Sequence, residues 1–433
     1  AKTVAKLGLK VCLIDRKREK DIGDKVCGEG MGRGYFGELG IKAPSGAELA
    51  RLIDGIDIYS PDREIVFRVG SEEDYGFVVN RHEFGQRLLK EALEAGADLL
   101  DYSLVTKVII EEDYVKGIEV KDLKTGNESK VYGKITVDAS GFASVIRKQL
   151  PEAWGVEPSI HNEDVELGYM EIRELKKQIE RPNYTRIYLS TKVAPGGYYW
   201  LFPKDGTKVN VGIGVQMAGN FPDPKKLLQE HVFNTPPFKD SKTIKSGTWF
   251  IPTRRPVASM VGNGIILIGD AAYQTNPISG GGMGPSMIGG KIAAEVGANA
   301  IERGDLSHAA LWPFNLAFIK RYGKKSAGLD IFRIFLQKCS DEELNYGMMN
   351  RLITEEDLLN ASLGKPLRLN ITEKASRVFR GLGKPSFLRQ LNFTVKKTNE
   401  IRALYDNYPQ PEGLAEWNAK VLRIINEMKA MKN

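Results

Sequence analysis

Residues 264–284 (GIILIGDAAYQTNPISGGGMG) place an acid and a cluster of glycines directly after an apolar run. The run Gly264–Ile268 predicts a buried parallel strand, so Gly269 and Asp270 would lie at its carboxyl end. Open α/β sheets bind their ligands outside the carboxyl ends of their strands. Asp270 could accept hydrogen bonds there from the sugar-alcohol chain of a ligand.

The same stretch continues with residues that would let a flat ring lie directly on the backbone. Pro277 and the glycines 280–282 keep side chains away from that surface. A helix beginning near Met283 or Gly284 would point its positive N-terminus at the ring, and a reduced flavin, which is negative near N1 and O2, would suit that position. The alternative is a strand, a turn and a helix in which the glycines serve packing alone.

Residues 1–17 (AKTVAKLGLKVCLIDRK) predict the second half of a βαβ unit. A short helix would end at Gly8, and a buried strand over Val11–Ile14 would lead to Asp15. In a dinucleotide-binding fold a G-x-G-x-x-G loop comes first, and an acid about 20 residues later binds the adenosine ribose. We therefore expect that loop upstream of Ala1 and Asp15 as the ribose-binding acid; the alternative is an acid that faces solvent.

Two further segments could approach phosphates. Arg81, in VNRHEFGQRLL, precedes a predicted helix and suits either a pyrophosphate or a surface ion pair. Gly141, Ser144 and Arg147, in DASGFASVIR, lie at a predicted turn from a strand to a helix. Either segment alone is weak evidence, but their order along the chain with Asp15 and Asp270 is hard to explain by chance.

Tyr198, Trp200 and Phe202 recur at every second position before Pro203, so a strand would present all three on one face. This periodicity alone favours an aromatic core. Cys27, in VCGEG, is a packed thiol or a reactive one. Cys339 is the only partner we would consider for it, because Cys12 lies on a predicted core strand.

Composition allows an enzyme of two or three domains, since the chain has 433 residues. The net charge of +7 suits an anionic partner such as a phosphorylated substrate or phospholipid headgroups, or reflects ordinary surface lysine and arginine. The chain has three cysteines, no CxxC motif and no secretory signal, so a disulfide framework is not expected. We therefore expect a cytoplasmic protein. No apolar run is long enough to span a membrane, and the four histidines show no metal-ligand spacing.

The hydrophobic pattern predicts an α/β fold: a discontinuous Rossmann-type domain, an antiparallel-sheet domain inserted into it, and a helical C-terminal region. A buried strand turning into a helix is expected over 134–150. We divide the chain into a first dinucleotide-binding part at 1–154, which includes sheet segments at about 50–80, a sheet domain at 155–250, a second dinucleotide-binding part at 251–311, and helices over 312–433. In the tail (419–433), Val421, Leu422, Ile425 and Met428 would form one apolar side, which we expect to pack on the body.

Taken in this order, Asp15, NRHEF, DASGFASVIR and GDAAYQTNPISGGGMG resemble the FAD-dependent family built on the para-hydroxybenzoate hydroxylase fold. Within that family, KVCGEGMG and YYWLFP are similar to the geranylgeranyl reductases, especially the archaeal digeranylgeranylglycerophospholipid reductase type. The likeness covers essentially the whole chain, including GLDIFRIFLQK and LNYGM in the helical region. It implies FAD as the cofactor. The residues that it implies for FAD binding are Asp15, Cys27, Gly28, Gly30, Arg81, Val105, Asp270, Pro277, Gly281, Gly282 and Met283.

The resemblance also implies the activity, which is saturation of isoprenoid double bonds in archaeal ether-lipid synthesis. Tyr198, Trp200 and Phe202 would then line the lipid cavity, and Cys27 would be catalytic, helping to deliver a proton or forming a redox-linked bond. The expected partners are a geranylgeranyl ether phospholipid or geranylgeranyl diphosphate, an external electron donor and peripherally a membrane surface, but no nucleic acid. A flavin monooxygenase or halogenase of the same fold, and a lipid carrier without turnover, remain the alternatives.

Overall fold

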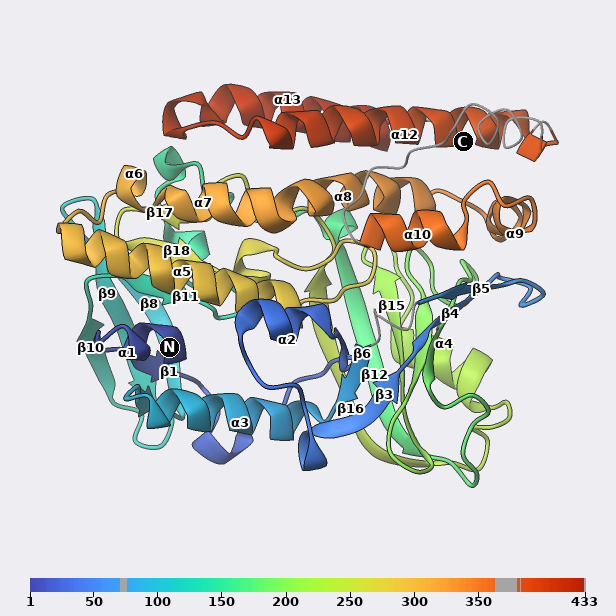
Figure 1. The fold of residues 1–433 in the computed structure, drawn as a ribbon, viewed down its shortest axis with the longest axis horizontal. Coiled ribbons are helices and arrows are strands. Elements are labelled where there is room, and N and C mark those ends of the chain that lie inside the picture. Colours follow the sequence, from blue (N-terminus) through green and yellow to red (C-terminus); the bar gives the residue numbers. More distant parts are fainter. Residues whose placement is uncertain (71–75, 363–379, 382, 432–433) are drawn as a thin grey trace.

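The computed structural model describes residues 1–70, 76–362, 380–381 and 383–431. It confirms the predicted fold class, an α/β flavoprotein-type fold with an inserted sheet and a helical C-terminal region. The large sheet lies at one side of the molecule and a group of smaller sheets lies at the other. Helices α2 (Gly34–Leu39), α3 (Arg81–Glu94) and α5 (Met283–Arg303) lie with those smaller sheets (Figure 1).

A seven-stranded sheet forms the large wall of the molecule. Its neighbours are antiparallel except β13 and β4, which run parallel. In spatial order the strands are β16 (Lys242–Pro252), β12 (Val165–Glu174), β15 (Lys208–Gln216), β14 (Tyr199–Pro203), β13 (Tyr184–Tyr188), β4 (Gly55–Tyr59) and β5 (Val66–Val69). The predicted long antiparallel strands are therefore confirmed.

Strand β15 has two very different faces, as its sequence KVNVGIGVQ requires. Val209, Val211, Ile213 and Val215 are buried in a core that also takes in Leu227 and Leu228 of α4 (Pro224–Leu228). Gly212 and Gly214 lie on the opposite face. A Cβ at position 212 would overlap the Trp200 ring, so only glycine leaves room for that ring. The sheet therefore has one filled face and one hollowed face.

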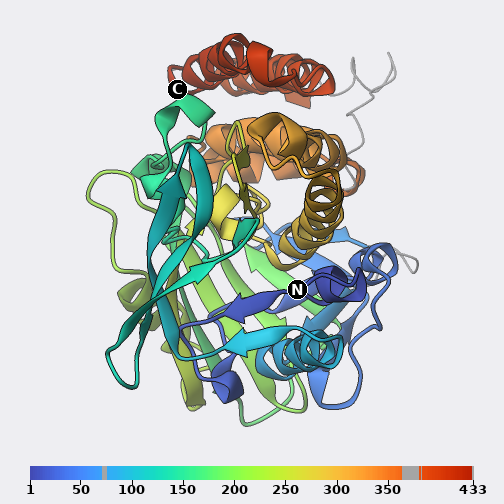
Figure 2. The ribbon, with the colours of Figure 1, turned by 90° about the vertical axis from the view of Figure 1, so that its left-hand side faces the viewer.

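The Rossmann-type part consists of short parallel pairs. Strand β1 (Cys12–Ile14) runs parallel to β7 (Asp98–Leu100), and β11 (Thr136–Asp138) runs parallel to β18 (Ile265–Leu267). The second pair continues through β17 (Val261–Gly262), and the antiparallel sheet β8 (Ser103–Glu111), β9 (Tyr114–Asp122) and β10 (Glu128–Tyr132) lies beside it (Figure 2). Strand β18 is completely buried, and α5 begins at Met283, so the strand, turn and helix predicted for 264–284 are confirmed.

Two local predictions in this part are wrong. The strand at 11–14 is not a core strand, because among the described residues only β7 pairs with it, and Cys12 is exposed. Residues 139–150 form no α-helix either. Gly141 and Ser144 take positive φ values of 81° and 38°, which interrupt a helix, and only a single 3₁₀ turn forms at Arg147–Gln149 before Pro151.

A fourth small sheet, β2 (Gly30–Gly32), β6 (Gly76–Val79) and β3 (Leu49–Ile53), carries the segment around Cys27. Strands β4 and β5 lie between β3 and β6 in the chain but join the large sheet, where β4 pairs with β13. Our division places residues 55–69 in the first dinucleotide-binding part. In the structure, β4 and β5 of this segment belong to the large sheet. The residue-by-residue division into domains stays a prediction.

The C-terminal region is helical, as predicted, and forms two layers. Helices α12 (Pro385–Asp406) and α13 (Leu414–Lys429) lie on the outer side of α7 (Pro313–Phe318) and α8 (Lys324–Leu336) in both views (Figures 1 and 2). Helices α6 (His308–Leu311), α9 (Asp341–Met349) and α10 (Glu355–Ser362) flank them. Among the described residues, no helix is both long and apolar enough to cross a bilayer.

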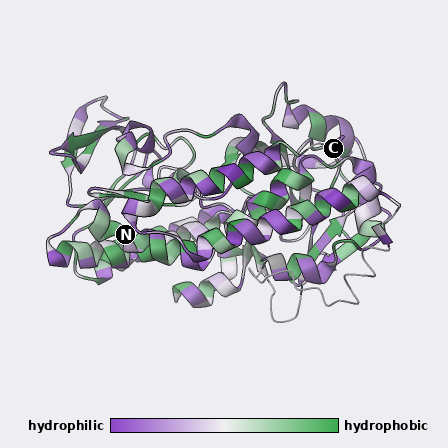
Figure 3. Cartoon of the chain, turned by 90° about the horizontal axis from the view of Figure 1, so that it is seen from above, coloured by the Kyte–Doolittle hydropathy of each residue, from purple (hydrophilic) through white to green (hydrophobic). Residues whose placement is uncertain are grey.

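Helix α13 packs on the body through an apolar stripe. Viewed from the side of α12 and α13, hydrophilic and hydrophobic residues are interleaved along the helices (Figure 3). Val421, Ile425 and Met428 are buried as predicted, but Leu422 is 41% exposed and Ile424 takes its place. The 3.6-residue period accounts for the difference, since positions 417, 421, 424 and 428 share one face.

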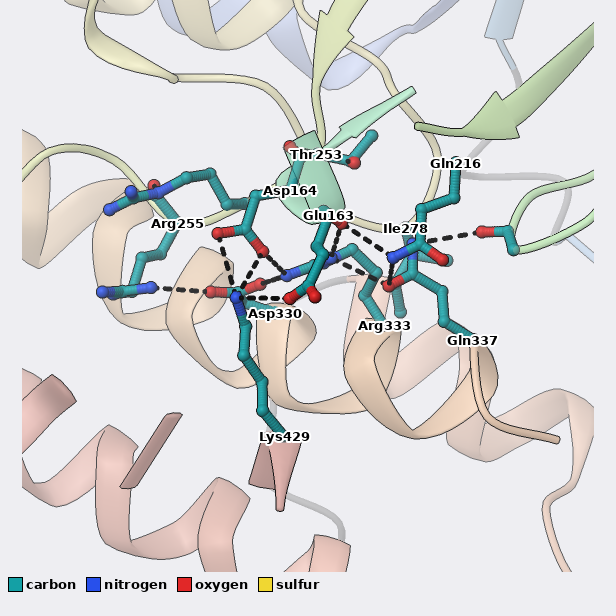
Figure 4. Close-up of polar contacts among 12 residues, drawn as sticks. Glu163, Asp164, Gln216, Thr253, Arg255, Ile278, Asp330, Arg333, Gln337 and Lys429 are labelled. Atoms are coloured by element: carbon teal, nitrogen blue, oxygen red, sulfur yellow. Dashed lines mark hydrogen bonds and ion pairs between the residues drawn. The ribbon is translucent and has the colours of Figure 1, made fainter. Parts of the chain in front are cut away.

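A buried ionic cluster joins these helices to the large sheet (Figure 4). Arg333 of α8 contacts Asp330 on its own helix and Asp164 directly before β12, both at 2.7 Å. Asp330 also pairs with Arg255, at 3.2 Å, and Lys429 of α13 contacts Asp164 at 3.5 Å. Because Asp330 is fully buried between two guanidinium groups, its charge is needed to compensate theirs.

We expect the substitution Asp330→Asn to lower the free energy of unfolding by about 3 kcal/mol, because it leaves buried arginine charge uncompensated. Chemical denaturation measures this change. Asp406→Asn is the matched control, since Asp406 forms an exposed pair with Lys324, and its loss should be under about 1 kcal/mol. Equal losses for the two variants would contradict the role given to the cluster.

Candidate active site

One cavity of about 860 Å³ lies between the hollowed face of the large sheet and the segment from Asp270 to the start of α5. Most of the residues predicted for the site meet there. Those that line the cavity are Cys27, Gly28, Gly30, Arg81, Tyr198, Trp200, Phe202, Asp270, Gly281, Gly282 and Met283. The structure thus brings together residues from four separate segments of the chain, 27–30, 81, 198–202 and 270–283.

Three predicted residues lie outside the lining of this cavity: Asp15, Val105 and Pro277. Asp15 follows β1, as expected of a ribose-binding acid, and its carboxylate accepts a hydrogen bond from the Lys17 backbone N–H at 2.8 Å. Val105 lies on β8 and packs against the main core, and Pro277 is buried beside the glycine segment. Their contact with a cofactor stays a prediction.

Backbone without side chains forms one end of the cavity. Gly280 takes a φ of +65°, and Gly282 immediately precedes α5. A Cβ at Gly282 would lie 3.3 Å from Oδ1 of Asp270, so a larger residue would crowd the acid. Oδ2 of Asp270 accepts from Lys25 Nζ at 2.9 Å, while Oδ1 has no hydrogen-bond partner among the described residues. Asp270 therefore keeps one acceptor for a ligand hydroxyl.

Three buried polar atoms have no hydrogen-bond partner within the described parts of the chain and belong to residues of the cavity wall: Arg81 Nε, Trp249 Nε1 and Thr275 Oγ1. An unpaired buried donor costs free energy, so such atoms commonly mark a ligand. Two fixed donors and a hydroxyl suit the ring carbonyls, ring nitrogens and phosphates of FAD, so the residues present fit this cofactor.

The loop carrying Cys27 is held by a buried network. Glu29 adopts a left-handed conformation, with a φ of 66°, and accepts from Lys204 Nζ at 2.5 Å and from Asn210 Nδ2 at 3.2 Å. Asn210 Nδ2 also donates to the Cys27 carbonyl at 2.8 Å. The Glu29 backbone N–H in turn donates to Cys27 Sγ at 3.2 Å. These contacts fix the thiol against the cavity wall.

The three aromatic residues share the cavity face, as the alternation of β14 predicts. Their ring centroids are 6.1 Å apart for Tyr198 and Trp200 and 6.3 Å apart for Trp200 and Phe202. Trp200 Nε1 donates to Asn210 Oδ1 at 3.0 Å, which fixes the indole over Gly212. A Cβ at Gly28 would lie 3.1 Å from the Phe202 ring. The glycines of the Cys27 loop thus let it approach the aromatic wall.

Sequence reasoning missed several polar residues of this site. Glu166 of β12 lines the cavity, is 5% exposed, and burial raises its pKa to about 8. Lys25 and Lys204 bind Asp270 and Glu29 from distant parts of the chain. Asn210 alone had a readable signal, since it is an amide inside an otherwise apolar buried strand. No local pattern distinguishes Glu166 from the other polar residues of β12.

The structure also bears on the predicted phosphate contact of Ser144 and Arg147 and on the pairing of Cys27 with Cys339. Ser144 donates to Asp138 at 3.1 Å, and Arg147 donates to the Glu157 carbonyl at 2.6 Å; both side chains are buried and neither lines the cavity. We therefore assign them to the fold and not to a phosphate. All three cysteines are free, and Cys339 is buried in the helical core, so Cys27 and Cys339 form no disulfide.

Comparisons with known structures define the class of protein. A crystal structure of a geranylgeranyl bacteriochlorophyll reductase-like protein from Thermoplasma acidophilum superposes with a TM-score of 0.74 at 26% identity, covering 91% of this chain and 95% of the other. A mutant of halogenase PltM in complex with FAD has a TM-score of 0.58 at 13% identity, covering 99% and 93%, which shows the fold alone. The fold and the cavity together define an FAD-dependent flavoprotein.

Sequence comparison narrows this class. Residues 164–251 match the geranylgeranyl reductase catalytic domain, and residues 61–156 match the tryptophan halogenase model. The digeranylgeranylglycerophospholipid reductase of Sulfolobus acidocaldarius is 40% identical over 98% of this chain and 94% of its own length. The chain belongs to the digeranylgeranylglycerophospholipid reductase family.

We expect Arg81→Met to raise the dissociation constant for FAD about tenfold or more, because it removes a buried charged donor from the cavity. Fluorescence titration of the flavin-free protein with FAD measures this constant. Arg87→Met on the same helix is the control, since Arg87 pairs with Glu48 and Glu91 and does not line the cavity. An unchanged constant for the Arg81 variant would contradict the assignment.

Proposed function

We propose that this cavity saturates the carbon–carbon double bonds of geranylgeranyl chains in archaeal ether lipids, with FAD as the cofactor. One observation carries the proposal: a single cavity joins a glycine-walled end with unpaired donors to a long apolar wall. The first end suits the flavin, and the wall suits a prenyl chain. The names of the relatives, which are digeranylgeranylglycerophospholipid reductases, support the same activity.

The apolar wall crosses the entire large sheet. Every one of its seven strands contributes to the lining; examples are Ile251, Met170, Gly214, Trp200, Ile187, Ile56 and Val69. Six spacings of about 4.8 Å make this wall roughly 29 Å wide. Aromatic and branched side chains bury much apolar area at little entropic cost. A slot of this length suits a long hydrocarbon chain better than a small aromatic substrate.

Saturation of an isolated double bond needs a hydride and a proton together, because nothing in the alkene stabilises a carbanion. When bound, the reduced flavin supplies the hydride. Tyr198, Trp200 and Phe202 would exclude water from the reacting bond. The fixed Trp200 ring would also stabilise developing positive charge on carbon by cation–π attraction. An external electron donor must reduce the flavin again before each further double bond is saturated.

We propose that Cys27 passes the proton to the double bond. Its thiol lines the cavity beside the aromatic wall, and the Glu29 N–H that donates to Sγ would stabilise the thiolate left behind. No other cysteine lines the cavity within the described residues. This role also agrees with the resemblance of the KVCGEGMG segment.

The variant Cys27→Ala should lower the rate of double-bond reduction about 100-fold, the loss typical of a missing general acid, while FAD binding is retained. Anaerobic turnover followed by mass spectrometry measures the rate, and absorbance measures bound flavin. Cys12→Ala is the control, because Cys12 is exposed and outside the cavity. Full turnover by the Cys27 variant would exclude the thiol from catalysis.

One end of the cavity is formed by α8 and the residues before it, and it carries several basic residues. These residues suit the anionic headgroup of the substrate. Lys320, Arg321, Lys324 and Lys325 all contribute to the lining. Lys320 and Arg321 are exposed, so the cavity reaches the surface there. Together with the net charge of +7, they support headgroup binding and peripheral contact with an anionic membrane.

The activity is tested by incubating the full chain anaerobically with FAD, dithionite and a geranylgeranylated lipid, followed by mass spectrometry. We expect the product to gain two hydrogens for each double bond, and we expect the diether phospholipid to be preferred over geranylgeranyl diphosphate. If flavin is bound but neither lipid gains hydrogen, the proposal fails. An oxygen-dependent gain of one oxygen atom by an aromatic substrate would instead indicate a monooxygenase.

A further inference from the structure

Asn210 is a polar side chain that lies behind the cavity wall. It is on β15 between two buried valines, Val209 and Val211, and none of its surface is exposed. It does not line the cavity itself. A buried amide costs free energy unless its donors and its acceptor are paired, whereas a leucine of the same branched shape carries no such cost. What this residue does is therefore decided by its hydrogen bonds.

One amide group joins the aromatic wall to the Cys27 loop. Oδ1 of Asn210 accepts from Trp200 Nε1 at 3.0 Å. Nδ2 donates to the Cys27 carbonyl at 2.8 Å and to Glu29 Oε2 at 3.2 Å. The N–H groups and the oxygen of the amide are thus all paired. These contacts connect β15 with β14 and with the loop that precedes β2.

The partners of Asn210 require an amide at this position. An indole N–H can only donate, whereas a carbonyl and a carboxylate can only accept. A carboxylate at position 210 would keep the bond to Trp200, but it would face the Cys27 carbonyl and the Glu29 carboxylate and repel both. An aliphatic side chain would leave the indole N–H and the carbonyl unpaired. The position therefore needs a side chain with both a donor and an acceptor.

Two of these partners carry groups that the proposed reaction uses. The Cys27 thiol lines the cavity, and its sulfur accepts from the Glu29 N–H at 3.2 Å. The Trp200 ring lines the cavity as well, and Gly212 leaves room for it. Because Asn210 is bonded to both residues, the place of the thiol relative to the indole depends on this one side chain.

We propose that Asn210 is a positioning residue that sets the Cys27 thiol and the Trp200 indole at neighbouring carbons of one double bond. The inference rests on the proposed function. In that reaction the π electrons of the alkene form a bond to the thiol proton, the S–H bond breaks, and Cys27 keeps its electron pair as a thiolate. The neighbouring carbon becomes electron-poor beside the Trp200 ring and receives the hydride, with its two electrons, from the reduced flavin. The thiolate regains a proton from water between reductions.

The relative position of these two groups matters because the proton and the hydride add almost together. If the thiol moves, positive charge develops on carbon before the aromatic ring can stabilise it. A displacement of about 1 Å can cost about 100-fold in rate. Asn210 does not touch the cavity, so its replacement should lower the turnover number and leave lipid binding almost unchanged.

A double-mutant cycle separates this role from a general effect on the fold. Asn210→Asp keeps the bond to Trp200 and loses the bond to Cys27, so it should lower the rate of double-bond reduction by the FAD-loaded protein about 30-fold, with KM for the geranylgeranyl diether phospholipid within about threefold. In a Cys27→Ala background the same substitution should cause little further loss, because residues that act as a unit are not additive. Anaerobic turnover with excess dithionite, followed by mass spectrometry, measures the rates.

Alkylation of the thiol tests its placement without turnover. The FAD-loaded protein, without lipid or reductant, is treated with iodoacetamide, and peptide mass spectrometry follows Cys27 and Cys12 separately. Asn210→Leu adds no charge and frees the loop, so Cys27 should react about fivefold faster, while the exposed Cys12 should react at an unchanged rate. Asn220→Leu is the matched control, since Asn220 is exposed after β15, and it should change neither rate.

Two results would overturn the inference. No loss from Asn210→Asp, or equal losses in the unmodified and the Cys27→Ala backgrounds, would show that Asn210 does not act through the thiol. An unchanged alkylation rate of Cys27 in Asn210→Leu would show that Asn210 does not place it. If Asn210→Asp binds no FAD, Asn210→Leu replaces it in the cycle, and its loss must be smaller in the Cys27→Ala background. If the unmodified protein reduces no lipid, the proposed function itself fails, and the alkylation rates still decide the placement of the thiol.

Discussion

The arrangement of this active site depends on the face of β15 that has no side chains. Valine and isoleucine anchor the strand in the core through its other face, so its position is fixed. On the cavity face, Gly212 leaves room for the Trp200 indole and Gly214 leaves room for the Glu166 carboxyl group. One strand thereby sets the floor of the lipid slot and the position of a buried acid. A methyl group at Gly212 would overlap the Trp200 ring, and one at Gly214 would displace the Glu166 carboxyl group.

Two buried polar networks secure the groups that face this floor. Lys204 and Asn210 reach out of the large sheet and hold Glu29, which fixes the Cys27 loop against Phe202. The ionic cluster around Arg333 connects the helical region to the first residues of β12 and neutralises the charge nearest Glu166. The contacts that bind the layers together thus lie close to Glu166, whose pKa is raised by burial and lowered by the Arg333 charge.

Local patterns predicted the parts of the structure that local physics determines. The strand, the acid, the glycines and the helix at 264–284 follow from hydrophobicity and backbone freedom alone, and alternation placed Tyr198, Trp200 and Phe202 on one face. Contacts between distant segments could not be predicted. Lys25 meets Asp270 across 245 positions, and β4 joins the large sheet beside β13. Glu166 looks like any other polar residue of its strand until the glycines opposite are seen.

The central claim is that one cavity holds both the flavin ring and the prenyl chain, and a crystal structure with FAD and a fully saturated diether phospholipid tests it most directly. The account predicts the flavin ring against the backbone of Gly281 and Gly282, with a ribityl hydroxyl on Asp270 and the hydrocarbon chain along Trp200 and Phe202. A flavin ring elsewhere, or a lipid chain bound outside the hollowed face of the sheet, would contradict it.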